Sequence, residues 1–166
     1  AHTVEFKNNM KDGAYKQYDE KGVLRAEVSF KNDKLDGPFT VYYPSQKIQL
    51  RETYQNGALN GERIEYYENG QIKSKTNFKQ NLLDGTVEEF SADGKQQSII
   101  TFVNGKRNGV AKAFYTNGKP LFEMHFKNNQ LDGDKLKYDE TGKIVEKCAY
   151  KEGKAISGVT TVDWKE

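Results

Sequence analysis

The sequence predicts an all-β protein, an elongated single-layer antiparallel sheet built as a β-hairpin solenoid. Three observations predict it: a glycine recurs every 24 residues, aromatic residues stand at two fixed places after it, and short alternating runs separate Asn/Gly-rich dipeptides. A fixed period of this length is typical of proteins in which each repeat packs only on its neighbours. These marker glycines are Gly13, Gly37, Gly61, Gly85, Gly109, Gly133 and Gly158.

The repeats predict how the domain is organised. We expect one domain over residues 1–166, with repeats 1 to 6 starting at residues 13, 37, 61, 85, 109 and 133, a half repeat over 1–12 and a cap over 158–166. Terminal repeats are often atypical because they close the array. The cap ends in Asp163-Trp164-Lys165-Glu166, a charged strand that would discourage edge-to-edge pairing.

Two aromatic rows run through the repeats, and positions are counted here from each marker glycine. Because strand side chains alternate between faces, and both positions are odd, the rows are predicted to share one buried face and form the core. We therefore expect Phe78→Ala to unfold or soften the middle of the array. Position 5 holds Tyr18, Tyr42, Tyr66, Phe90, Phe114 and Tyr138, and position 17 holds Phe30, Tyr54, Phe78, Phe102, Phe126 and Tyr150.

Two turns are predicted in each repeat. Asn69-Gly70, like its counterparts in other repeats, separates two alternating runs and favours a two-residue hairpin turn, which requires positive φ angles. Position 9 is glycine in every repeat except the second, which has Gln46. A second turn, which closes the repeat, is predicted where an Asn/Gly-rich pair such as Asn56-Gly57 or Asn104-Gly105 is followed by a sequence such as Leu83-Asp84-Gly85.

Composition narrows the class of function. The chain carries 26 Lys and Arg against 24 Asp and Glu, with the signs interspersed, so a nucleic-acid footprint is not indicated. The mean hydropathy of −0.92 is too polar for a thick two-layer core, whereas the periodic aromatics argue against disorder. No apolar run is long enough for a membrane-spanning helix.

The succession of glycine, a Tyr/Phe pair, Asn-Gly and a closing Asp-Gly resembles the MORN-repeat variant of bacterial YwqK-type antitoxin proteins. Its clearest instances are Tyr66-Tyr67-Glu68-Asn69-Gly70 and Phe114-Tyr115-Thr116-Asn117-Gly118. The resemblance covers about residues 4 to 158 and implies a β-hairpin repeat protein used for binding. It brings no catalytic motif, no cofactor and no metal ligands.

Residues suited to catalysis or metal binding are few. The only candidate nucleophile and base for a catalytic pair are Cys148 and His125. Because they occupy positions 15 and 16 of their repeats, their side chains are predicted to lie on opposite faces of the sheet. His2 and His125 lie far apart, and no metal-ligand spacing is present. Asp36, Asp84 and Asp132 recur before glycines, where such side chains usually bond nearby backbone. We predict no enzyme activity, no cofactor and no metal site.

Five residues are candidates for binding a partner. Tyr43, Tyr67 and Tyr115 share position 6, on the side away from the predicted core, and aromatic residues are enriched at interfaces. Ile99 and Leu121, together with Val145, are apolar on a face that is charged in earlier repeats, which predicts either a docking patch or a local register shift. Packing of the tyrosines on one another within the sheet is an equally good interpretation.

The function predicted from the sequence is that of a non-enzymatic protein-binding module, with an antitoxin- or immunity-like role implied by the resemblance. The partner would be a toxin or a surface protein. The alternative is an envelope or surface scaffold that binds lipid or another surface component. The start at Ala1-His2-Thr3 indicates a processed or trimmed chain, and we favour an extracytoplasmic location in a bacterium, in the cell envelope or secreted.

Overall fold

The computed structural model describes residues 1–158 and 160–161, and these form an all-β protein, as predicted. The described residues contain no helix, and therefore none that could cross a membrane. Most of the predicted cap, including Asp163 to Glu166, lies outside the described residues. Thr160–Thr161 form a short strand, β16, which pairs with β14.

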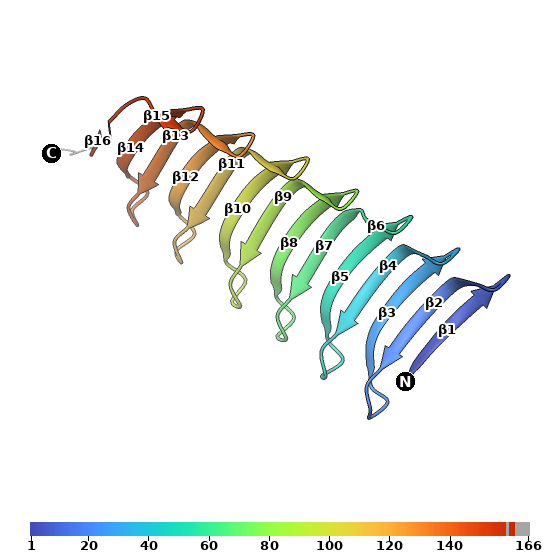
Figure 1. The fold of residues 1–166 in the computed structure, drawn as a ribbon. Coiled ribbons are helices and arrows are strands. Elements are labelled where there is room, and N and C mark those ends of the chain that lie inside the picture. The colour runs from blue at the N-terminus through green and yellow to red at the C-terminus, as the bar shows by residue number, and fades with distance from the viewer. Residues whose placement is uncertain (159, 162–166) are drawn as a thin grey trace. The chain divides into compact units, whose positions relative to one another are not determined.

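The chain divides into two compact units, Ala1–Leu82 and Leu83–Glu166. Within each unit the strands of six or more residues pair antiparallel in chain order (Figure 1). The N-terminal unit contains β1 (His2–Lys7), β2 (Met10–Tyr18), β3 (Leu24–Lys31), β4 (Lys34–Tyr42), β5 (Ile48–Gln55), β6 (Ala58–Leu59), β7 (Gly61–Tyr66) and β8 (Ile72–Lys79). The C-terminal unit contains β9 (Leu82–Phe90), β10 (Gln96–Val103), β11 (Lys106–Phe114), β12 (Pro120–Lys127), β13 (Gln130–Tyr138), β14 (Ile144–Lys151), β15 (Lys154–Ala155) and β16. Leu82, the first residue of β9, is counted with the N-terminal unit.

Asn69-Gly70 and its counterparts at positions 8 and 9 of the other repeats do not form two-residue turns, so that prediction is wrong. Tyr67 N–H donates to the carbonyl of Gln71 at 2.8 Å, and Gly70 N–H donates to the carbonyl of Tyr67 at 2.9 Å. Only the glycine has positive φ, at 90°, and Asn69 does not. This is a three-residue loop with a left-handed glycine at its end. We call the side of the sheet where these loops join the ends of successive strands the loop edge.

The two-residue turns lie at the opposite ends of the strands, which we call the turn edge. Both central residues have positive φ, as in Asn32 at 48° and Asp33 at 62°, the signature of a type I′ turn. Asparagine and glycine predominate there because they tolerate the left-handed region. The pairs with positive φ at both residues are Asn8-Asn9, Asn32-Asp33, Asn56-Gly57, Gln80-Asn81, Asn104-Gly105, Asn128-Asn129 and Glu152-Gly153.

The closing turns lie at the Asn/Gly-rich pairs, as predicted, but the Leu-Asp-Gly sequences that follow these pairs lie inside strands, so the prediction that they belong to the turns is wrong. In β4, Phe39 pairs with Val28 and Leu35 pairs with Phe30, which leaves Asp36 and Gly37 in a bulge opposite β3. The left-handed φ of Gly37, 107°, explains why a marker glycine is needed at this place.

A second bulge changes the faces of the sheet. Tyr18 pairs with Leu24, but Gln17 pairs with Ala26, so Arg25 at position 12 is an extra residue in β3. The same shift occurs in all six repeats. One extra residue moves every later side chain of the strand to the other face. The two aromatic rows therefore lie on opposite faces, and the prediction that they share one is wrong.

Side-chain contacts identify both faces. We call face A the one that bears the position 17 row, where Phe30 meets Tyr15 with ring centroids 6.2 Å apart. Face B bears the position 5 row, where the Tyr42 hydroxyl donates to Glu27 at 2.8 Å. Glu27 also pairs with Lys16, 2.8 Å away on the same face. The position 17 row thus meets another aromatic side chain on face A, whereas the position 5 row meets charged side chains on face B.

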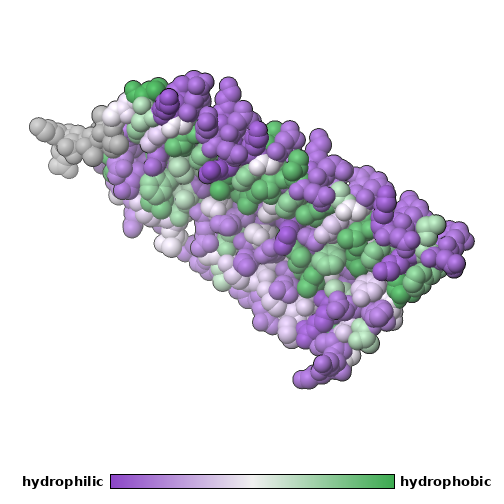
Figure 2. Space-filling view, viewed as in Figure 1, coloured by the Kyte–Doolittle hydropathy of each residue, from purple (hydrophilic) through white to green (hydrophobic). Residues whose placement is uncertain are grey.

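The sheet has almost no enclosed core. Among the described residues only Val28, Ala111, Cys148 and Glu52 are buried. Phe78, expected to be a core residue, is half-buried. Its replacement by alanine should therefore cost less than the roughly 3 to 5 kcal/mol typical of a buried aromatic. In Figure 2 hydrophobic side chains lie open on the surface over the strands, between hydrophilic ones.

Hydrogen bonds between successive turns couple the repeats. Asn129 N–H donates to the carbonyl of Arg107 at 2.9 Å, and Asn129 Oδ1 accepts from Arg107 N–H at 2.7 Å. Asp33 makes the same two bonds with Lys11. Asp132, expected to bond nearby backbone, instead accepts from the N–H of Glu152, in the next turn, at 3.4 Å.

Removing one of these side-chain acceptors should weaken the coupling. We expect Asn129→Ala to lower the free energy of unfolding by about 1 to 2 kcal/mol, through one lost hydrogen bond and left-handed strain on alanine. Asn129→Asp is the matched control, because Asp33 performs the same role in the N-terminal unit. Urea denaturation would measure both, and equal losses for the two variants would contradict this explanation.

Candidate partner-binding surface

Two of the three candidate tyrosines are fixed at the loop edge by their hydroxyl groups. Tyr43 donates to the carbonyl of Tyr66 at 2.7 Å, and Tyr115 donates to the carbonyl of Tyr138 at 2.8 Å. Both acceptors lie one repeat further along the chain. The three tyrosines are half-buried rather than fully exposed. The hydroxyl bonds therefore hold these two rings in one orientation and link neighbouring repeats.

Aspartate occupies the position of these tyrosines in the first and last repeats and stabilises the loop itself. Asp19 accepts from the N–H groups of Val23 and Lys21, both at 2.9 Å, and pairs with Arg25 at 2.7 Å. The Val23 N–H, above all, lowers the pKa of Asp19 below its ordinary value. Because the pKa of Asp19 is lower in the folded than in the unfolded protein, the carboxylate stabilises the fold at pH values above its unfolded-state pKa. This contribution is lost as the pH falls through the folded-state pKa.

The apolar candidates do not form one patch. Leu121 and Val145 are bulge residues at position 12, on face A, where the equivalent Lys73 meets Glu65 at 3.7 Å. Ile99 pairs with Lys112, a face B residue whose ammonium lies 3.0 Å from Glu123. All three are half-buried. Within the C-terminal unit, Leu121 and Ile99 thus lie on opposite faces.

A charged cluster interrupts face A in repeats 2 and 3. Glu52 is 7% exposed and stands at position 15, where Val28 and Cys148 are buried in other repeats. Its carboxylate accepts from the Tyr54 hydroxyl at 2.9 Å and lies 3.6 Å from Arg63 Nε. The cluster borders a pocket that contains a candidate tyrosine; its lining residues are Val41, Tyr43, Gln49, Leu50, Arg63, Glu65, Tyr66 and Lys73.

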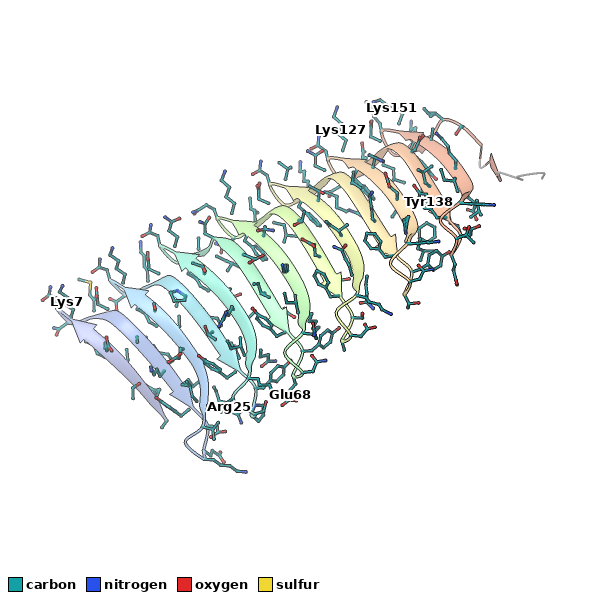
Figure 3. All side chains as sticks on the ribbon, turned by 180° about the vertical axis from the view of Figure 1, so that it is seen from behind. Lys7, Arg25, Glu68, Lys127, Tyr138 and Lys151 are labelled. Atoms are coloured by element: carbon teal, nitrogen blue, oxygen red, sulfur yellow. The ribbon has the colours of Figure 1, made fainter. Side chains whose placement is uncertain are left out.

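The turn edge combines exposed apolar and basic side chains. Of the large hydrophobic residues that are exposed in the described part of the chain, all but Ile156 flank the type I′ turns, and these are Phe6, Met10, Leu82 and Val103. Lysines lie in the same rows, and Figure 3 labels Lys7, Lys127 and Lys151 at strand ends. Lys31 pairs directly with Lys34, an arrangement that is unfavourable because like charges repel.

The cysteine and histidine considered for catalysis lie on opposite faces, as predicted. Cys148 is buried on face A, where its thiol donates to the carbonyl of Ser157 at 3.2 Å. His125 lies on face B, with Nε2 3.3 Å from Glu123. Within the described residues, no three His, Cys, Asp or Glu side chains gather closely enough to hold a metal ion.

Comparison with known proteins identifies the repeat. The family model described as "MORN repeat variant" matches the chain six times, over residues 11–32, 35–56, 59–80, 83–104, 107–128 and 131–152. These matches share the 24-residue period of the marker glycines. No curated protein matches the chain.

Proposed function

We propose that this chain, which belongs to the MORN repeat variant family, is a non-catalytic module that binds another protein through its loop edge. MORN repeats are commonly protein- or lipid-binding modules. In the finer form of the proposal the partner is a toxin, and the chain acts as an antitoxin or immunity protein. A surface protein is the other partner that we consider.

One observation supports the loop edge as the binding surface for the partner. The hydroxyls of Tyr43 and Tyr115 are bonded to the next repeat, so their rings are held in place before any partner arrives. Side chains ordered in advance lose little conformational entropy on binding. Tyrosine and arginine are also enriched among residues that dominate binding energy. Tyr43 lies in a pocket with Arg63, which brings both residue types together at this edge.

The test is a triple substitution. Tyr43→Ala, Tyr67→Ala and Tyr115→Ala together should weaken binding of a purified partner by at least about 1 to 2 kcal/mol, because aromatic anchors are lost. Stability should also fall, since the rings are half-buried. Titration calorimetry would measure binding, and circular dichroism would confirm the fold.

The matched control keeps the rings. Tyr43→Phe and Tyr115→Phe remove only the hydroxyl bonds, at about 1 kcal/mol of stability each, and should leave binding nearly unchanged. A folded triple variant that binds as tightly as the natural protein would exclude the loop edge as the binding surface.

A second candidate function is supported by the turn edge. Exposed Met10 and Leu82 share the turn edge with the lysine pair Lys31 and Lys34 and suit contact with an anionic bilayer, where apolar tips insert and cations stay at the headgroups. The chain would then be a surface scaffold. The test is cosedimentation with phosphatidylserine vesicles: the variant Lys31→Gln, Lys34→Gln, Leu82→Ser should lose binding if this function is correct and keep it otherwise.

A further inference from the structure

A pocket on face B, at the loop edge of repeats 2 and 3, is unlike the rest of the repeat framework. Six residues line it: Gln46, Lys47, Ile48, Arg51, Tyr66 and Gly70. Its walls combine two basic side chains with an aliphatic and an aromatic one, and no carboxylate is among them. None of its residues is in the set of five that the sequence suggested.

Arg51 differs from every other arginine of the chain. Arg25 pairs with Asp19, Arg63 pairs with Glu52 and Glu65, and the Arg107 guanidinium lies 4.6 Å from the centroid of the Phe126 ring. The Arg51 side chain makes no hydrogen bond and no ion pair within residues 1–158 and 160–161, and its charge acts only on the Tyr42 hydroxyl nearby. Its planar fork, which matches a carboxylate with two parallel hydrogen bonds, therefore remains available on the exposed surface of β5.

The loop beside Arg51 is strained where its counterparts are not. Position 9 takes a left-handed conformation, with φ of 65° at Gln46, and glycine occupies the equivalent place in the other five repeats. A residue with a side chain costs roughly 1 to 2 kcal/mol in this conformation. Unfavourable backbone of this kind clusters at functional sites. Lys47 then extends from the same loop and donates to the carbonyl of Glu68 at 2.9 Å.

We propose that this pocket binds an acidic side chain, Asp or Glu, of a protein partner, with an apolar neighbour of that residue against Ile48 and Tyr66. The inference rests on the proposed protein-binding function and adds the chemistry of the partner. Charge complementarity carries it: the lining holds Arg51 and Lys47 and no acidic group. Arg51 would take the carboxylate with both arms of its guanidinium, while Lys47 adds positive charge nearby.

Short capped peptides test the pocket without a natural partner. We would titrate the ¹⁵N-labelled protein with acetyl-Leu-Glu-Leu-amide and with acetyl-Leu-Gln-Leu-amide at low ionic strength. The Glu peptide should shift the amide signals of residues 46–51 and 66–70, and the Gln peptide should bind at least about tenfold more weakly, because the charged hydrogen bonds are lost. Equal binding of both peptides would overturn the proposal.

Matched variants test whether Arg51 is the residue that binds the carboxylate of the Glu peptide. Arg51→Gln should reduce the affinity for the Glu peptide at least about tenfold, and Arg51→Lys should reduce it less, since the charge remains but the fork is lost. Lys75→Gln removes the same charge at the equivalent position of the next repeat and should change the affinity less than about twofold. Equal losses from Arg51→Gln and Lys75→Gln would show only unspecific electrostatics and overturn the proposal.

Inorganic phosphate is the competing anion. The proposal requires phosphate to displace the Glu peptide poorly, because it makes no contact with the apolar walls. Displacement at similar concentrations would identify a general anion site and overturn the acidic-peptide assignment. Failure of the peptide experiment leaves the tyrosine substitutions informative, since these probe the binding of a whole partner through different side chains.

Discussion

Replacing Arg63 by leucine should lower the free energy of unfolding by about 3 kcal/mol, because it leaves the carboxylate of Glu52 buried without its cation. Glu52 is 7% exposed and would keep only the hydrogen bond from Tyr54. The Arg63 side chain is itself 37% exposed, which places the loss at the lower end of the range for buried ion pairs. Chemical denaturation followed by tyrosine fluorescence would measure it.

The double variant Glu52→Val, Arg63→Leu provides the control. Val28 occupies position 15 in repeat 1, so valine has a precedent at this place. Replacing both charges by apolar groups should recover most of the loss, since a buried ion pair contributes little net stability over a well-packed apolar pair. A single variant as stable as the natural protein, or a double variant no better than the single one, would contradict this account of face A.

Replacing Gly133 by alanine should cost about 3 kcal/mol, for two reasons that act together. The φ of Gly133 is 125°, a conformation that is strained for any residue with a side chain. A Cβ at this position would also lie 3.0 Å from the Cβ of His125, too close for ordinary contact. Overpacking adds roughly 1 to 3 kcal/mol to the backbone strain. Thermal and urea denaturation of the variant would measure the sum.

Two other glycines separate the strain from the contact. Gly118 has φ of 82° and open space around a Cβ, so Gly118→Ala should cost only about 1 to 2 kcal/mol of strain. Gly158 has neither the strained φ nor a close neighbour, so its replacement should change stability by less than about 0.5 kcal/mol. If Gly133→Ala were no more destabilising than Gly118→Ala, the bulge geometry would be wrong.

The sequence is sufficient to predict the 24-residue repeat and the all-β fold, because glycines and aromatics recur at fixed spacing. The faces could not be predicted from alternation alone. Position 12 holds Arg25, Lys73 and Leu121 in different repeats, so no residue type marks it as the extra residue of a bulge. One unmarked residue is enough to move the later aromatic row to the other face.

The loop at Asn69-Gly70 differs from its prediction for a related reason. Asn-Gly is the strongest short signal for a two-residue hairpin, yet in Asn69-Gly70 only the glycine is left-handed. The true type I′ turns include Gln80-Asn81 and Glu152-Gly153, whose first residues give little signal. The spacing of cross-strand partners, which decides between two- and three-residue loops, is visible only in the structure.

The candidate surface was predicted only in part. The tyrosines at position 6 were identified from their repeat spacing, but their hydroxyl bonds to the next repeat depend on how the loops stack. Arg51 was missed because a single arginine on a strand resembles any other. The sequence does mark the neighbouring loop, because Gln46 is the one residue at position 9 that is not glycine. Combined with the left-handed φ, that break directs attention to the pocket beside Arg51.

The most direct test of binding through the loop edge is photo-crosslinking in the cells that produce the protein. A benzophenone amino acid would replace Tyr67 at the loop edge in one variant and Lys31 at the turn edge in another, with circular dichroism to confirm that both are folded. The proposed function predicts a discrete protein adduct from position 67 and none from position 31. An adduct from position 31 alone, or none from a folded position 67 variant, would contradict it.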